Sequence, residues 1–302
     1  TSTVARVEEA PAGRGFKYSL KWTSTSAVGS IAAGNTLKFS YRIERQDIQR
    51  LGYGSSNAKK ATLSFWAKGS IAGKIGVSCT RDSRITSHQV TMTANTWEFH
   101  EIVIPIDTST AISGTDNANG FAIGICWGAG SNSTSGATNG WIGFHNAYTA
   151  GFTAGQQGAY LTTSGSTFQI TGVQLEVGSV STPFEHKSYG EELRRCQRYF
   201  QRVQGGLTGI GANSSTIRSN YRPMVNFRAV PTITGNANVT FNNPGINSPT
   251  QSSFSCGLQF TPSSIDNVGM TLGFGNYSNA TQGYTYLQWD SDDEHIDFSA
   301  EL

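Results

Sequence analysis

The chain has 302 residues, enough for two domains of ordinary size, and a formal net charge of only +2. Charged residues make up 14% of it, well below the roughly 25% of an average soluble domain. This balance gives no electrostatic footprint for nucleic acid, and no apolar run reaches the about 18 residues of a membrane span, so neither partner is expected.

Short strands joined by tight turns are predicted for the first 185 residues. Apolar and polar side chains alternate over 16–22, 37–43 and 61–67, which is typical of half-buried strands. The same reading predicts one helical turn over 47–51 and further strands over 74–79, 89–92, 97–104, 120–127 and 166–177. Regularly spaced strands with Gly-rich turns predict an all-β fold, here an N-terminal jelly-roll β-sandwich over 1–185.

Two long loops, 128–139 and 146–157, interrupt these strands and are rich in Gly, Ser, Ala and Asn. Loops of this length are usually functional or mobile. Glycan binding needs aromatic platforms near polar groups, so Tyr148, Phe152 and Trp141 are candidate platforms. Two alternatives stay open: a place in the core, above all for Trp141, and a place at a subunit interface.

One helix is predicted over 188–203, because apolar residues recur there at helical spacing. Ser188 and Glu191 form a capping box, and the pair Gly205-Gly206 stops the helix. We expect residues 186–204 to form a helical clasp between two domains, with an ordinary packing helix as the alternative. The clasp residues are Pro183, Phe184, Tyr189, Leu193, Cys196, Tyr199 and Phe200.

Strands return after the clasp and predict a small C-terminal β-sandwich over 205–302, a candidate receptor-binding tip. They are expected over 207–210, 215–220, 224–227, 232–234, 238–241, 255–261, 270–274, 285–289 and 296–298. Tyr277 and Trp289 are the candidate glycan platforms of this domain.

Metal and catalytic signals are weak. The acidic segment 290–295 is most simply a solvated hairpin turn, while Ca²⁺ binding by Asp290, Asp292 and Asp293 is the sharper alternative. The four cysteines fit no zinc motif, so buried free thiols are expected. Metalloprotease, nucleophile-elbow and P-loop patterns do not occur, so we expect no enzyme and no cofactor beyond that Ca²⁺.

A long run of residues carries a family resemblance. The segments TGVQLEVGS (171–179), TPFEH (182–186), YGEEL (189–193) and CQRYF (196–200), with 51–54, 61–70 and 95–105, resemble bacteriophage tail-fibre and related virion proteins. The modules of that family look like carbohydrate-binding jelly rolls. Residues 222–233 are similar to the start of the family's following domain, and the resemblance implies a module that begins before Thr1.

The resemblance implies a non-catalytic tail-fibre protein of the virion, made in the host cytoplasm. Its implied partners are further copies of itself in a homotrimer, other virion proteins and a bacterial surface polysaccharide. The alternative is a capsid decoration, head-fibre or tail-joining protein. A depolymerase is the third hypothesis, and we expect none, because neither a convincing carboxylate pair nor a parallel β-helix repeat is visible.

Overall fold

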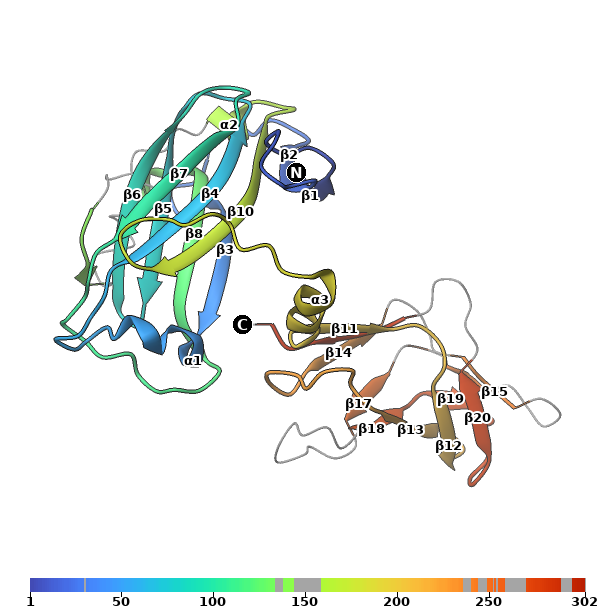
Figure 1. Cartoon of the computed structure of the whole chain (residues 1–302). Coiled ribbons are helices and arrows are strands. Elements are labelled where there is room, and N and C mark those ends of the chain that lie inside the picture. Colours follow the sequence, from blue (N-terminus) through green and yellow to red (C-terminus); the bar gives the residue numbers. More distant parts are fainter. Residues whose placement is uncertain are drawn as a thin grey trace. The chain divides into compact units, whose positions relative to one another are not determined.

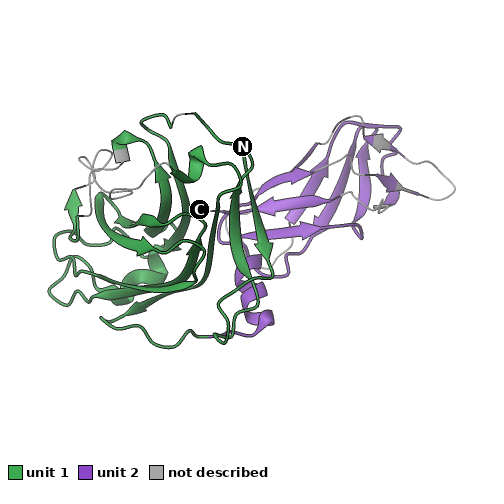
Figure 2. Cartoon of the chain, turned by 90° about the horizontal axis from the view of Figure 1, so that it is seen from above, with its two compact units in different colours: residues 1–185 green, residues 186–302 purple. Residues whose placement is uncertain are grey.

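The computed structural model describes residues 1–29, 31–133, 138–143, 159–235, 240–243, 249–251, 253, 255–258, 270–288 and 295–301. These residues are arranged mainly in antiparallel β-sheets, so the predicted all-β fold is confirmed (Figure 1). The chain divides into two compact units, unit 1 with Thr1–Glu185 and unit 2 with His186–Leu302 (Figure 2).

Unit 1 contains two five-stranded sheets. The first, the β4 sheet, has the order β1 (Ser2–Val7), β2 (Ser19–Ser24), β10 (Thr167–Val177), β4 (Ala61–Gly69) and β7 (Glu98–Ile104). The second, the β8 sheet, has the order β3 (Thr36–Glu44), β8 (Asn119–Ala129), β5 (Gly73–Arg81), β6 (Arg84–Met92) and β9 (Ile142–Gly143). Unit 1 also contains short helices: α1 (Arg45–Ile48), η1 (Gln49–Leu51), η2 (Ser131–Ser133) and α2 (Ala159–Thr162).

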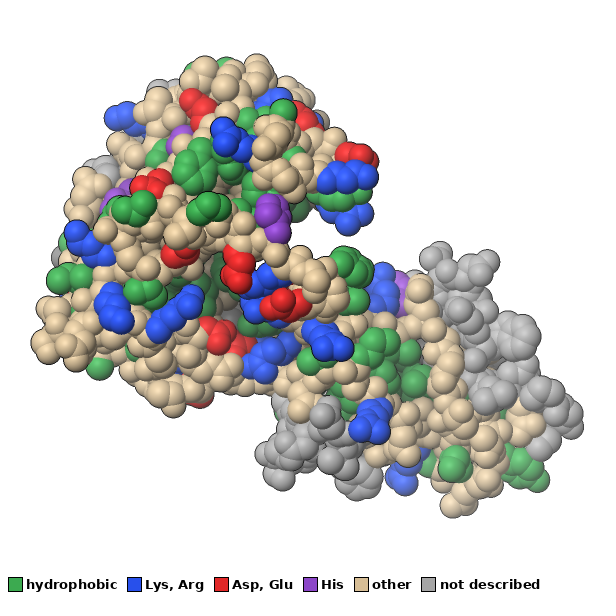
Figure 3. All heavy atoms as spheres, in the orientation of Figure 1, with side chains coloured by type: hydrophobic (Ala, Val, Ile, Leu, Met, Phe, Trp, Pro, Cys, Tyr) green, Lys and Arg blue, Asp and Glu red, His purple; other side chains and the backbone are tan. Residues whose placement is uncertain are grey.

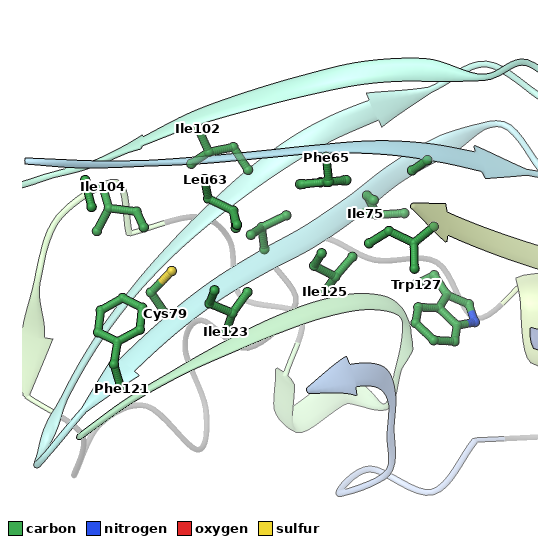
Figure 4. Packing of buried hydrophobic residues seen from close by; sticks show 14 of the residues in the cluster. Leu63, Phe65, Ile75, Cys79, Ile102, Ile104, Phe121, Ile123, Ile125 and Trp127 are labelled. Atoms are coloured by element: carbon green, nitrogen blue, oxygen red, sulfur yellow. The ribbon is translucent and has the colours of Figure 1, made fainter. Parts of the chain in front are cut away.

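The core of unit 1 lies between these two sheets, as Figure 4 shows. Successive side chains of a strand point to opposite faces, so Leu63 and Phe65 of β4 point inward together, toward Ile123 and Ile125 of β8. Burying each such side chain contributes about 1.5–3 kcal/mol relative to leaving it exposed. The period-two alternation seen in the sequence therefore reports which face of each strand the core covers.

Unit 2 is built from shorter strands around its own core of buried aromatic and aliphatic side chains. One sheet has the order β11 (Phe200–Val203), β21 (Ile296–Ser299) and β14 (Thr232–Gly235). A second has the order β15 (Phe241–Asn242), β20 (Thr285–Gln288), β12 (Thr208–Asn213), β13 (Thr216–Tyr221), β18 (Met270–Phe274) and β17 (Cys256–Leu258). A third pairs β16 (Thr250–Gln251) with β19 (Tyr277–Ser278). The strand predicted over 224–227 is absent, because this stretch forms bends.

The predicted clasp helix is shorter than expected. Helix α3 spans Tyr189–Gln197, and Ser188 caps it by accepting a hydrogen bond from the backbone N–H of Glu191 at 3.3 Å. Residues 200–203, predicted to continue the helix, instead form β11 and pair with β21. Pairing with β21, a strand distant in the sequence, therefore overrides the helical spacing of these residues.

Most of the predicted clasp residues are exposed or half-buried. No residue of α3 is buried, and Tyr189 exposes 82% of its surface. Leu193, Cys196 and Phe200 are exposed too, Tyr199 is half-buried, and Pro183 is exposed. Phe184 is half-buried, and its ring meets the ring of Phe16 edge-on at 5.0 Å. The role of 186–204 as a clasp between the units stays a prediction.

The four cysteines differ in burial. All four cysteines are free, with Cys79 and Cys126 buried, Cys256 half-buried and Cys196 exposed, so the expected burial is wrong for Cys196. Burial raises the pKa of Cys126 to about 11, which keeps this thiol protonated.

Among the described residues, none of the helices has the length and apolar character needed to cross a bilayer.

Candidate functional site

Trp141 is packed into one end of unit 1. Its ring lies 5.7 Å from that of Tyr53 and 6.2 Å from that of Phe121, and its indole N–H donates to the carbonyl of Pro105 at 2.8 Å. Trp141 is half-buried, and these contacts engage its ring and its polar atom. They support the packing role that was the alternative, while a role as a glycan platform stays a prediction.

The other sequence candidates fall into two groups. Tyr277 exposes only 5% of its surface and meets Phe241 edge-on at 6.0 Å, so its ring is part of the unit 2 core and offers no free face. Tyr148, Phe152 and Trp289 lie outside the described residues, as do the Ca²⁺ candidates Asp290, Asp292 and Asp293. Their roles stay predictions. Within the part that is described, no group of three or more metal-ligating side chains comes together.

Arg81, the last residue of β5, is a fully buried cation. One of its terminal nitrogens donates to an Asp107 carboxylate oxygen and to the carbonyl of Thr110, both at 2.6 Å. Arg84 donates to the same carboxylate oxygen at 2.7 Å and to the carbonyl of Trp141 at 2.9 Å. This network ties the segment after β7 to β5, β6 and Trp141, and so it sets the shape of this end of the sandwich.

The Asp107 carboxylate holds two arginines together. Burial raises the pKa of Asp107, but hydrogen bonds from the Ser109 hydroxyl and backbone N–H and the charge of Arg81 outweigh it. The pKa of Asp107 therefore lies below its usual value. A carboxyl group held ionised in this way serves structure and is not suited to donate a proton.

The outward face of the β4 sheet carries a different set of aromatic side chains. Trp66 of β4 is directly opposite Phe99 of β7, and their ring centroids are 5.3 Å apart. Phe99 exposes 46% of its surface, and Trp66 is half-buried. On the other side of Trp66, the register places Thr171 of β10. A line of side chains thus crosses three neighbouring strands on one face.

Thr171 ends this line at β10, where its hydroxyl donates to the backbone carbonyl of Tyr18 at 2.9 Å. Neighbouring strands lie about 4.8 Å apart, so the line from β7 to β10 spans about 10 Å. We call Phe99, Trp66 and Thr171 the aromatic row. In Figure 3, hydrophobic side chains lie among acidic and basic ones on the visible face of unit 1.

One arginine lies over a ring of the aromatic row. The guanidinium of Arg14 lies 5.1 Å from the Trp66 ring, within the about 6 Å range of cation–π attraction. The row therefore combines apolar ring surface with a cationic group.

A polar clamp holds the N-terminal segment over the β4 sheet. Glu9 accepts from Lys68 at 2.6 Å and from Gln169 at 3.1 Å, and the buried hydroxyl of Ser19 donates to Gln169 at 3.0 Å. The hydrogen bond from Lys68 is the main cause of the lowered pKa of Glu9. Because Lys68 and Gln169 belong to β4 and β10, the clamp fixes the segment that carries Arg14.

Gly172 lets the chain pack closely beside the aromatic row. It sits in a bulge of β10 between Thr171 and Gln174 with φ +61°, a conformation that favours glycine. A Cβ there would lie 2.5 Å from the ring of Phe16. The Phe16 ring lies against the bulge and meets Phe184 edge-on, so the Thr171 end of the row lies next to this apolar contact.

Acid–base catalysis finds no support in the described residues. Wherever a carboxyl pKa is shifted there, it is lowered, whereas a general acid needs it raised. Burial also lowers the pKa values of His88 and His100, and the His100 ring contacts the Met92 sulfur at 3.1 Å.

Comparison with known proteins gives likeness only among solved structures. No protein-family model and no curated protein matches the chain. A family 11 carbohydrate-binding module from Clostridium thermocellum is 12% identical with a TM-score of 0.30, and the match covers 60% of this chain and 85% of the module. A tandem of family 22 modules from Paenibacillus barcinonensis Xyn10C is 9% identical with a TM-score of 0.29, covering 100% of this chain and 84% of the tandem.

The enzymatically active domain of bacteriophage CBA120 tailspike protein 4 is 13% identical, with a TM-score of 0.30. The match covers 58% of this chain but only 18% of that chain. The structural neighbours thus include carbohydrate-binding modules and a phage tailspike domain. At these identities and TM-scores they say nothing about a ligand of this chain, which has to be inferred from its own residues.

Sequence reasoning missed the aromatic row, although a signal for it exists. Leu63 and Phe65 define the inward phase of β4, so Trp66 stands in the outward phase that polar residues normally occupy. Phe99 likewise alternates against the inward Ile102 of β7. A large aromatic residue in the polar phase of a strand is the pattern that could have identified this surface.

Proposed function

We propose that unit 1 is a non-catalytic glycan-binding module and that the aromatic row is its sugar-contacting surface. The observation that carries the proposal is the outward cross-strand pair of Phe99 and Trp66. The C–H faces of a sugar ring are apolar, and an exposed aromatic ring offers them a flat surface of matching character. Polar groups beside the row supply the hydrogen bonds that orient a sugar.

We further propose that the whole chain belongs to a bacteriophage tail fibre that binds a polysaccharide of the host cell surface. The support is the sequence resemblance of 171–200 together with this surface. The same proposal includes assembly as a homotrimer with other virion proteins, in the virion. Light scattering of the chain would then give about three times its mass of 32.4 kDa.

The aromatic row predicts which substitutions weaken glycan binding. We expect Phe99→Ala to weaken it about tenfold, since losing a stacking surface worth about 1.4 kcal/mol changes affinity by that factor. The measurement is binding of the full chain to an array of bacterial surface polysaccharides. Tyr41→Ala is the matched control, because Tyr41 is an exposed aromatic residue on β3 of the other sheet. Equal binding by Phe99→Ala and the unchanged chain would contradict the proposed site.

A structural role in the virion is the second candidate function. Large apolar side chains are strongly exposed at Val180, Tyr189 and Met224, as is expected of surfaces that pack against another protein. Imaging the chain on the particle separates the two functions. A position in the capsid lattice would favour a decoration or head-fibre protein, and a position at the tail tip would favour receptor binding.

A further inference from the structure

We infer that the aromatic row selects an acidic saccharide and that Arg14 binds its carboxylate; this inference rests on the proposed glycan-binding function. Arg14 is exposed and stands over Trp66 at 5.1 Å. Within the described part of the chain, the guanidinium contacts the Trp66 ring and no carboxylate pairs with it. A cationic group fixed beside an apolar ring is suited to a sugar that is both apolar on its face and anionic at its rim.

The position of Arg14 is set by a tight turn. Gly13 and Gly15 on either side of it have φ values of +70° and +80°, in the region that favours glycine. The turn is exposed, and stacking on the indole limits the freedom of the guanidinium. Its edge carries N–H donors in the planar arrangement that matches a carboxylate at two points. An acidic sugar therefore meets a donor group that is already oriented.

The acidic side chains near the row already have partners. Glu9 is held by Lys68 and Gln169. Glu101, opposite Ser64 on β7, accepts from the backbone N–H and hydroxyl of Ser181. Glu98 accepts from the backbone N–H and hydroxyl of Thr93.

Among the described residues, Arg14 has no carboxylate partner, whereas the nearby Lys68 pairs with Glu9 at 2.6 Å. Glu101 accepts from neutral donors and stays negatively charged, so the acidic group of a ligand is expected at Arg14. Charge complementarity there favours a saccharide whose carboxylate lies beside the Trp66 ring.

The test uses the full chain and an array that pairs uronic-acid-containing bacterial polysaccharides with their carboxyl-reduced forms. We expect binding to the acidic forms, with a loss of about tenfold or more on reduction, because hydrogen bonds to charged groups contribute about 1.5–3 kcal/mol. Arg14→Gln should lose about as much on the acidic forms, and Arg14→Lys should recover only part of it. Binding should also fall as salt rises.

Controls separate this inference from the proposed function. Arg50→Gln changes an exposed arginine of η1 away from the row and should leave binding unchanged. Equal binding to reduced and acidic forms, with Arg14→Gln neutral and Phe99→Ala impaired, would overturn the acidic specificity and leave the glycan-binding function standing. Glycan binding that neither Phe99→Ala nor Arg14→Gln alters, or no binding to any glycan, would overturn both. Unfolding midpoints of the Arg14 variants within about 2 °C of the unchanged chain confirm that they fold.

Discussion

Arg81 and Asp107 show how much of the geometry of unit 1 depends on single buried charges. Arg81 is enclosed by the rings of Tyr53 and Trp141, at 5.2 and 5.6 Å, and it shares Asp107 with Arg84. Its buried Nε has no hydrogen-bond partner, so the pairing with Asp107 matters all the more. Removing Asp107 would break both of these ion pairs and leave Arg81 with its longer pair to Asp82, at 3.4 Å.

Asp107→Asn is expected to destabilise unit 1 by about 3–5 kcal/mol, because it removes the charge that two arginines share, one of them fully buried. Urea unfolding followed by tryptophan fluorescence measures this loss. Asp116→Asn is the matched control: its ion pair with Arg45, at 3.2 Å, is largely exposed and should contribute less than about 1 kcal/mol. Similar losses for both variants would contradict a special role of the buried network.

The same two variants are expected to differ in how their stability falls at acidic pH. The pKa of Asp107 is lower in the folded chain than its ordinary value of 3.8, so the unfolded chain takes up this proton first as pH falls. The stability from this group is fully present well above pH 3.8 and is lost as pH falls through the lowered pKa. The Asp107→Asn chain should lack this part of the acid destabilisation, whereas Asp116→Asn should keep it.

Strand β10 shows how one glycine joins fold and surface at the scale of an element. The bulge at Gly172 brings Phe16 onto the strand while Thr171 stays in register with Trp66. The sequence shows a glycine inside a strand pattern, which indicates a bulge or a close approach, but it does not show which ring approaches.

Gly172→Ala is expected to cost about 1–3 kcal/mol of stability, because the new Cβ needs both an unfavourable φ and space that Phe16 fills. Gly165→Ala is the matched control: its φ is +79°, but nothing lies within 4 Å of the added Cβ, so only the backbone cost of about 1 kcal/mol applies. Urea unfolding of both variants gives the comparison. Equal losses would show that the Phe16 contact adds nothing.

Helix α3 shows the limit of periodicity as a signal. Its start was predictable, because the Ser188 cap and Glu191 are local features. Its end was not, because the spacing of Tyr199 and Phe200 fits a helix while β21, almost 100 residues later, offers Phe200 a strand partner. The distant partner decides between two conformations that the local pattern leaves nearly equal.

At the scale of the whole molecule, the chain has two separate hydrophobic cores. One is formed by residues of unit 1 and the other by residues of unit 2. A unit that buries its own core has the main driving force it needs to fold.

Fragments 1–185 and 186–302 are each expected to fold alone. Each should give a β-type circular dichroism spectrum and one cooperative thermal transition, and the full chain should show both transitions at similar temperatures. Differential scanning calorimetry of the three proteins measures this. An unfolded fragment, or a single transition in the full chain at a temperature found in neither fragment, would show that the units depend on each other.

The sequence by itself determined the all-β class, most strand positions and the start of α3, because alternation and capping are encoded in neighbouring residues. Only the tertiary structure decided which aromatic side chains pack in the interior and which face outward. Trp141 and Tyr277 stand beside loop-like segments yet are packed, whereas Trp66 and Phe99 stand within strands yet face outward. The physical reason is that exposure depends on what covers a side chain. For Trp141 that cover is Tyr53 and Phe121, which come from other parts of the chain.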